Sequence, residues 1–221
     1  CALPIYRIVR FFHSLTLCVS LAERRKKELL MKSITYLFLL FLFLSCSNEE
    51  FTLEQYEKFP VKFAKQVITY PNNTFELFLP KNWEWNVENF DSTDEIILGI
   101  NAWSKQNEKN YIDVISVQKS KGLSNAKNLK AEYEIILEKL KQNLNYKLIE
   151  SGKSSFFENE TYFLHYRSNS GNYGEVEIIS LITESKSDKN FYYINASASR
   201  TKDLKMNMSK MVQCLKTFKE N

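Results

Sequence analysis

An apolar run near the N-terminus constrains this chain most, because it separates a processed segment from the part that must fold. From Ile34 to Leu44 nearly every residue is apolar, with Lys32 before the run and the small residue Ser45 after it. The order of charged, apolar and small residues is typical of a secretory signal. A transmembrane helix needs ~20 apolar residues, and this run is shorter, so a membrane span is the weaker alternative. Residues 31–45 are therefore predicted to be a signal peptide.

Cys46 directly follows this signal and is predicted to be the lipidated first residue of the mature protein. Ordinary signal cleavage favours small residues one and three positions before the cut, and Phe43 is bulky. The sequence "FLSC" instead resembles a bacterial lipobox, in a variant with Leu44 that is familiar from Bacteroidetes-type lipoproteins. The resemblance implies a diacylglyceryl group and an added acyl chain such as palmitate on Cys46. Two or more acyl chains hold a protein stably in a bilayer.

The sequence "SNEEF" after Cys46 resembles the acidic export tag of lipoproteins of this type. This resemblance implies a lipid-anchored protein of the outer membrane that is exposed at the cell surface. The alternative is that these residues are only a solvated acidic tether.

Residues 1–30 stand before the predicted signal and are expected to be non-native translation of upstream nucleotide sequence. The stretch "CALPI" contains no initiating methionine and matches one reading frame of a common sequencing adapter. The alternative is a natural amphipathic extension. We exclude these residues from the interpretation of the fold.

The charge of the chain changes once these segments are set aside. Residues before Cys46 carry seven of the 30 Lys and Arg but only two of the 26 Asp and Glu, which leaves 23 basic and 24 acidic residues. A nucleic-acid-binding face needs clustered net basic charge, so no nucleic-acid partner is expected. The remaining length suits one domain. We predict a lipidated polar tether over 46–73 and a single domain over 74–221.

Only two cysteines, Cys46 and Cys214, remain in the mature chain. Once Cys46 is acylated, no intramolecular disulfide is possible, so stability must come from packing. The segment "MVQCLKTF" predicts a half-buried helical position for Cys214, and a reactive thiol is the alternative.

The order of elements predicts an α+β fold with a largely antiparallel sheet packed by two main helices. Apolar runs with strand character begin with "TFELFLP", and "EIILGINAWSK" and "YIDVISVQKS" follow as a hairpin. Apolar residues at helical spacing, Leu129 to Leu144, then predict a helix with Ser124 as its N-cap. Four more strands follow, joined by short turns that favour antiparallel neighbours. A second helix over about 204–218 closes the chain, with Thr201 or Asp203 as its cap.

This order, led by "FELFLPKNWEW" and closed by "YINASASRTKDLKMNMSKMVQCLKTF", resembles the Mog1/PsbP-like α/β/α sandwich over about residues 75–218. Proteins of this group are binding or assembly-accessory modules, so the resemblance implies a non-enzymatic role. A fold does not carry a function by itself, and no functional residue of the family matches a motif in this chain.

Catalytic chemistry finds little support in the residues, and no catalytic residue, metal site or cofactor is expected. His165 is the one histidine after Cys46, so paired-histidine zinc ligation is excluded, and a structural or surface position in a strand is expected. Asp113 is unusual within a strand-like run. We expect Asp113 to pair with Arg167 or Arg200, or to be exposed, and a role in a functional site is the alternative.

Three tryptophans are the residues best suited to contact a ligand or partner: Trp83, Trp85 and Trp103. In an extended segment Trp83 and Trp85 share one face, where their rings could stack on a sugar or hold an apolar anchor. Core packing is the alternative. Asp91-Ser92-Thr93 resembles an O-glycosylation sequon of exported Bacteroidetes proteins, with Ser92 as the modified residue. The sequence thus predicts an outer-membrane lipoprotein that binds an envelope protein partner or supports an assembly, or else a glycan or small-ligand receptor that uses the tryptophans.

Overall fold

The computed structural model describes residues 50–88, 95–123 and 128–221. Residues 50–221 form one compact unit. Cys46, Ser92 and the predicted cap Ser124 lie outside the described residues. Within those ranges, no helix combines the length and the apolar character that a bilayer crossing requires.

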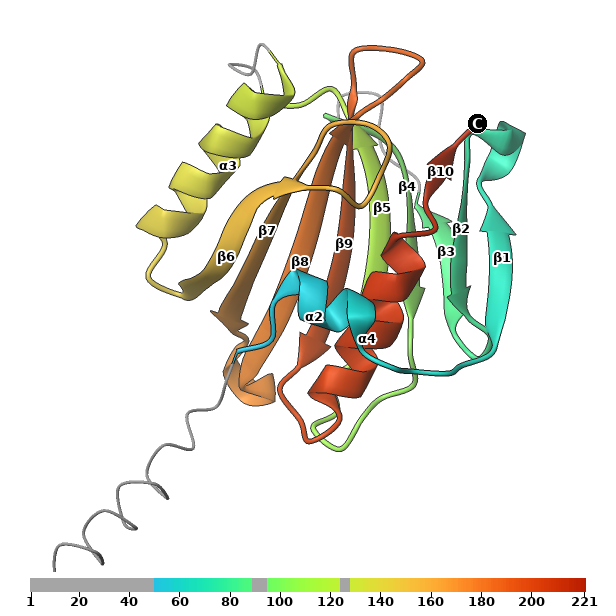
Figure 1. Ribbon diagram of the computed structural model, residues 1–221. Helices are drawn as coiled ribbons and strands as arrows, with labels where there is room; N and C mark the ends of the chain where they lie inside the picture. The colour runs from blue at the N-terminus through green and yellow to red at the C-terminus, as the bar shows by residue number, and fades with distance from the viewer. Residues whose placement is uncertain (1–49, 89–94, 124–127) are drawn as a thin grey trace, which may run out of the picture. The chain divides into compact units, whose positions relative to one another are not determined.

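A seven-stranded antiparallel sheet forms the centre of the fold, in the order β3-β4-β5-β9-β8-β7-β6 (Figure 1). Its strands are β3 (Glu84–Glu88), β4 (Ile96–Trp103), β5 (Val114–Ser120), β6 (Tyr146–Ser154), β7 (Thr161–Asn169), β8 (Glu175–Glu184) and β9 (Phe191–Ser199). The predicted β4–β5 hairpin and the predicted antiparallel neighbours β6 to β9 are confirmed.

A second sheet of three strands contains β1 (Lys65–Thr69), β2 (Phe75–Pro80) and β10 (Lys219–Glu220), with β2 in the middle. The short turns η1 (Pro71–Asn73) and η2 (Gly171–Tyr173) join β1 to β2 and β7 to β8. Helix α4 (Leu204–Leu215) packs against β9 and β2, and the short helix α2 (Leu53–Lys58) packs on α4. Helix α3 (Leu129–Gln142) packs against β6, β7 and β8. The two predicted main helices and the α+β class are therefore confirmed.

The two helices cover opposite faces of the large sheet, because their apolar residues belong to separate cores. Met208, Met211 and Leu215 of α4 are fully buried in the main core with the inner side chains of both sheets. Leu129 and Tyr133 of α3 belong to a smaller core with Tyr162 and Leu164 of β7. Neighbouring residues of a strand point to opposite faces, so Tyr162 and Leu164 face α3 while Phe163 joins the main core.

Two local expectations for α3 do not hold. Its N-cap is Asn128, whose side chain accepts a hydrogen bond from the Ala131 N–H at 2.9 Å. The helix ends at Gln142, so Leu144 lies beyond it and is 99% exposed instead of continuing the apolar stripe.

The predicted polar tether over 46–73 is also too long, because the folded unit begins at Glu50. Thr52 and Gln55 form a capping box that starts α2. Leu53 and Tyr56 of α2 are buried in the main core. Residues 50–73 therefore belong to the domain.

We call the two ends of the large sheet the proximal end and the distal end, according to the loops that form them. The proximal end is formed by the loops 104–113, 143–145, 170–174 and 200–203, and the distal end by the loops 155–160 and 185–190. Glu50 lies at the proximal end, where its carboxylate accepts hydrogen bonds from Lys147 and Arg167, both at 2.9 Å. The described chain therefore begins at the proximal end, as Figure 1 shows.

Candidate functional site

The three tryptophans do not form one cluster. Trp83 packs against the main core. Trp85 pairs with the buried Ala102 and shares its face, and Trp85 is 38% exposed. Trp103 pairs with Glu84, and cross-strand partners share a face. Since Glu84 and Trp85 are consecutive, Trp103 lies on the opposite face of the sheet from Trp85.

A cleft beside Trp83 is the first candidate site, and we call it the Trp83–Asp113 cleft. It lies between the β2–β3 turn, the loop 104–113 and helix α4, with a volume of about 360 Å³. Its lining is almost wholly polar apart from Trp83: Asn82, Ser104, Lys105, Gln106, Asn107, Asp113, Asn207 and Lys210. One aromatic ring among amides, a hydroxyl, two ammonium groups and a carboxylate suits a ligand that has both a C–H face and hydrogen-bonding groups.

Asp113 is the unusual group of this cleft. It is only 3% exposed, its Oδ2 accepts a hydrogen bond from Asn207 at 3.0 Å, and its buried Oδ1 has no hydrogen-bond partner among the described residues. Burial raises the pKa of Asp113 to about 6, although the Ser199 backbone N–H, the Asn207 amide and the Lys210 charge partly offset that effect. An unpaired buried carboxylate oxygen at a cleft wall marks a functional-site candidate.

The expected arginine partners of Asp113 are absent from its contacts within the described chain. Arg167 pairs with Glu50 and Glu177, and Arg200 pairs with Glu175 at 2.6 Å. The expectation of exposure also fails. Asp113 is held instead by the first turns of α4, which the strand pattern around it could not indicate.

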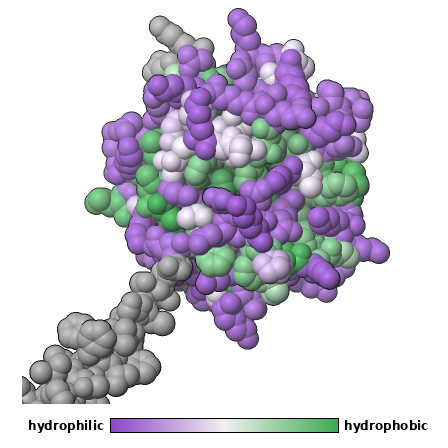
Figure 2. Space-filling model, viewed as in Figure 1, coloured by the Kyte–Doolittle hydropathy of each residue, from purple (hydrophilic) through white to green (hydrophobic). Residues whose placement is uncertain are grey.

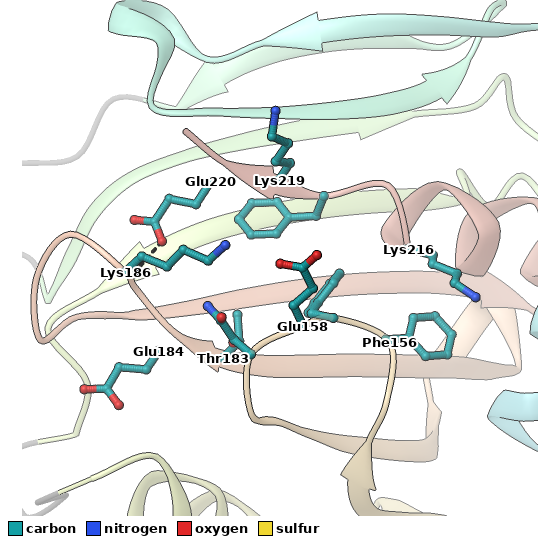
Figure 3. Close-up of a pocket in the computed structure, with 11 residues that line it drawn as sticks. Phe156, Glu158, Thr183, Glu184, Lys186, Lys216, Lys219 and Glu220 are labelled. Carbon is teal, nitrogen blue, oxygen red and sulfur yellow. Dashed lines mark hydrogen bonds between the residues drawn. The ribbon is translucent and has the colours of Figure 1, made fainter.

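A second pocket, with a volume of about 290 Å³, lies at the distal end (Figure 3). Its apolar lining comes from Phe156, Phe157 and Phe218. In Figure 3 the side chains of Glu158 and Lys186 extend toward the middle of the pocket, while Glu184 points away. The pocket therefore combines three aromatic rings with charges of both signs at its mouth.

Glu220 of β10 closes one side of this distal pocket. Its carboxylate accepts hydrogen bonds from the Ser185 hydroxyl and the Lys186 backbone N–H, both at 2.6 Å. The buried ammonium of Lys119 lies 3.7 Å from the same carboxylate. Although burial alone would raise the pKa of Glu220, these hydrogen bonds lower it overall. The distal wall is thus fixed by the C-terminal strand.

His165 is structural, as predicted, and lies in a buried hydrogen-bonded network. Its Nε2 is 2.8 Å from Glu177 Oε1 and its Nδ1 is 3.1 Å from Glu150 Oε1. The Tyr56 hydroxyl donates to the same Glu177 oxygen at 2.6 Å. Burial alone would lower the pKa of His165, but the hydrogen bonds to the two carboxylates outweigh it and raise that pKa. The network joins α2 to the sheet.

Cys214 is more deeply buried than expected, since its side chain is enclosed in the main core. Burial raises the pKa of this thiol to about 12, so the thiolate required for reactivity is disfavoured. Within the described ranges, no group of three or more His, Cys, Asp and Glu side chains has an arrangement that could hold a metal ion.

Sequence reasoning missed several residues that build these sites. Asn207 and Lys210 read as polar positions on the solvent side of α4, although they line the cleft. Phe156 was predicted to end a strand, but β6 ends at Ser154, and Phe156 and Phe157 both lie in the distal loop. The pair of adjacent phenylalanines before a polar loop was the one available signal for the distal pocket.

Comparison with known proteins identifies the fold. The solution structure of cyanobacterial PsbP from Synechocystis matches with a TM-score of 0.50 and 12% identity, covering 80% of this chain and 98% of that chain. The Ran-binding protein Mog1p of Saccharomyces cerevisiae matches with a TM-score of 0.48 and 9% identity over 72% of this chain and 96% of its own. LpqN of Mycobacterium tuberculosis, described as involved in cell envelope biogenesis, matches with a TM-score of 0.46 and 11% identity, covering 76% of this chain and 96% of that chain.

No family model and no curated protein matches this sequence. The match to cyanobacterial PsbP confirms the predicted Mog1/PsbP-like sandwich as the fold. Identities this low establish the fold alone, because one fold serves many functions.

Proposed function

We propose that this protein is a lipid-anchored, non-enzymatic binding module of the outer membrane that holds a hydroxyl-rich ligand, such as a glycan, in the Trp83–Asp113 cleft. The observation that carries the ligand class is the lining of the cleft, in which the Trp83 ring lies among the amides of Asn82 and Gln106. Sugar hydroxyls would exchange hydrogen bonds with these amides, and the C–H face of the sugar would stack on the Trp83 ring. The amides of Asn82 and Gln106 both donate and accept hydrogen bonds.

We favour binding over catalysis because His165 and Cys214, two side chains with catalytic potential, are buried away from the candidate sites. Both ring nitrogens of His165 are held by carboxylates in a buried network. The thiol of Cys214 is enclosed in the core. Neither group lines the Trp83–Asp113 cleft or the distal pocket.

A glycan array of neutral oligosaccharides, probed with residues 47–221, tests the ligand class. Trp83→Leu should abolish binding to any oligosaccharide that the unsubstituted protein retains, and Asn82→Ala should weaken it. Trp103→Leu is the matched control, because Trp103 lies on the other face of the sheet. Binding that survives Trp83→Leu, or an array without any bound oligosaccharide, would overturn the assignment.

The lipid anchor is supported by the signal-like run and by Cys46 directly behind it. Expressed from Met31 in a bacterium, the protein should partition into detergent with an acylated Cys46, and Cys46→Ser should remain unacylated. Intact mass spectrometry separates these outcomes, and an unmodified Cys46 would refute the anchor. Surface exposure is tested by Glu49→Ala, which should reduce cleavage by protease added to cells if the acidic tag directs export.

A second candidate function is the capture of a partner protein, and the distal pocket favours it. Three phenylalanine rings with charged groups at the mouth suit the apolar anchor side chain of a protein partner. A photo-crosslinking residue at position 186 should then give a discrete cross-linked product in cells. The same residue at the exposed position 130 on α3 is the control. Equal labelling from both positions would count against a partner site.

A further inference from the structure

The described chain begins at the proximal end of the sheet, and this limits how far from that end the proposed lipid anchor at Cys46 could lie. Cys46 precedes Glu50 by four residues, which span at most ~14 Å even when fully extended. Glu50 is itself tied to the sheet by its ion pairs with Lys147 and Arg167. A bilayer that holds the acyl chains of Cys46 would therefore lie close to the proximal end.

The proximal end carries a basic hollow with a volume of about 440 Å³. Four basic side chains and one carboxylate line it: Lys109, Arg200, Lys202, Lys205 and Glu175. Glu175 is already paired with Arg200. The Lys109 ammonium donates to the Arg200 backbone oxygen at 2.7 Å, which holds the loop 104–113 against the loop 200–203. Glu108 and Asp203 also belong to these loops, but neither lines the hollow, whose lining carries four basic groups against one carboxylate.

Exposed apolar side chains lie at the same end of the sheet. Leu144 is 99% exposed, Tyr146 at the start of β6 is 38% exposed, and Tyr173 in the loop 170–174 is 41% exposed. The Asn169 N–H donates to the Asn145 carbonyl at 3.2 Å, so the loop of Leu144 adjoins the carboxyl end of β7. Figure 2 shows an apolar projection at the left edge, where Figure 1 draws the connection between α3 and β6.

We infer that the proximal end is a membrane-contact surface, with the basic hollow receiving the phosphate headgroup of an anionic lipid and Leu144 and Tyr173 reaching the interface. Lysines near an anionic surface are attracted to it, and tyrosine and leucine side chains partition into the headgroup region. This inference rests on the proposed lipid anchor for its orientation. It adds that the folded domain contacts the bilayer directly, in addition to being tethered to it through the acyl chains of Cys46.

The test uses residues 47–221, which lack the acylated cysteine but contain all the buried core residues of the described chain. These residues should sediment with vesicles made of equal parts phosphatidylcholine and phosphatidylglycerol, and not with phosphatidylcholine alone. Lys202→Ser should weaken this binding about five-fold, the change that ~1 kcal/mol for one surface lysine represents. Leu144→Ser should weaken it several-fold without changing the thermal unfolding of the domain.

Lys186→Ser at the distal end is the matched control, because it removes the same charge from an exposed position. Equal loss from Lys186→Ser and Lys202→Ser, or no preference for the anionic vesicles, would overturn the inference. Inorganic phosphate should compete no better than chloride at matched ionic strength. Stronger competition would assign the hollow to free phosphate and overturn the lipid assignment.

The two proposals fail separately. An unmodified Cys46 in cells would remove the anchor without affecting vesicle binding by residues 47–221. Absent vesicle binding would remove the contact surface and leave the acylation of Cys46 untouched.

Discussion

The substitution Asp113→Asn should stabilise the protein at neutral pH, which is the opposite of the usual result for a buried side chain. Asp113 is 3% exposed and its pKa is raised to about 6 from 3.8. This rise in the pKa corresponds to about 3 kcal/mol in favour of the neutral form over the charged form in the folded protein. The carboxylate therefore lowers the stability of the folded state whenever it is ionised.

The direction in which the stability of the folded state changes with pH follows from the linkage between protonation and folding. A carboxyl whose pKa is raised on folding binds protons more tightly in the folded state, so its favourable contribution is present at low pH. That contribution is lost as pH rises from about 4 through about 6. Asparagine resembles the protonated form at every pH. Asp113→Asn should thus match the unsubstituted protein near pH 4 and exceed its free energy of unfolding by up to about 3 kcal/mol above pH 7.

Urea denaturation across this pH range measures the difference between the two proteins directly. Asp188→Asn is the control, because at Asp188 the effect of burial is outweighed by the hydrogen bond from Lys119 and the pKa is lowered. Its contribution is present at neutral pH and lost in acid, so Asp188→Asn should destabilise most at neutral pH. A pH-independent difference for Asp113→Asn, or a loss of stability at neutral pH, would refute the reasoning.

Two further predictions concern the core and the buried network. Leu215→Ala should lower the free energy of unfolding by ~3 to 5 kcal/mol, because the Leu215 side chain is fully buried. Leu137→Ala should lower it by less than ~2 kcal/mol, because Leu137 is only partly buried. Urea denaturation of both variants checks this ranking. Lys139→Ala is the control and should change the free energy of unfolding by less than ~0.5 kcal/mol. Equal effects of the two leucine substitutions would contradict the ranking. Tyr56→Phe should cost ~1.5 to 3 kcal/mol, because the change removes a hydrogen bond to the Glu177 carboxylate. An unchanged melt would mean that α2 is held without that bond.

Helical and strand periodicity was sufficient for the large elements, because each presents a long apolar face to one core. The stripe of Met208, Met211 and Leu215 predicted α4, and these residues are buried as the pattern requires. Helix α2 could not be predicted in the same way, since its six residues bury only Leu53 and Tyr56. A pattern of two apolar residues in a polar stretch also fits a tether.

The sites depend on pairing register, which the sequence does not contain. Alternation placed Trp83 and Trp85 on one side of an extended segment. Only the pairing of Glu84 with Trp103 shows that Trp103 faces the other way, because a shift by one residue reverses every side chain of a strand. The partners of Asp113 come from α4, 94 residues later in the chain for Asn207. Such a contact follows from packing between elements and leaves no local pattern.

The proposed contact with the bilayer also limits what the Trp83–Asp113 cleft could bind in cells. The cleft is lined by residues of the loop 104–113, which belongs to the proximal end, whereas the distal pocket lies at the other end of the sheet. A cleft that opens beside a membrane surface admits a short oligosaccharide more readily than a long chain, because a long chain must also find room above the lipid headgroups. Acylated protein on vesicles should therefore bind a short oligosaccharide as tightly as residues 47–221 do, but bind a long chain of the same sugar more weakly. Equal affinity for the long chain in both forms would place the cleft away from the bilayer and contradict the proposed orientation of the domain.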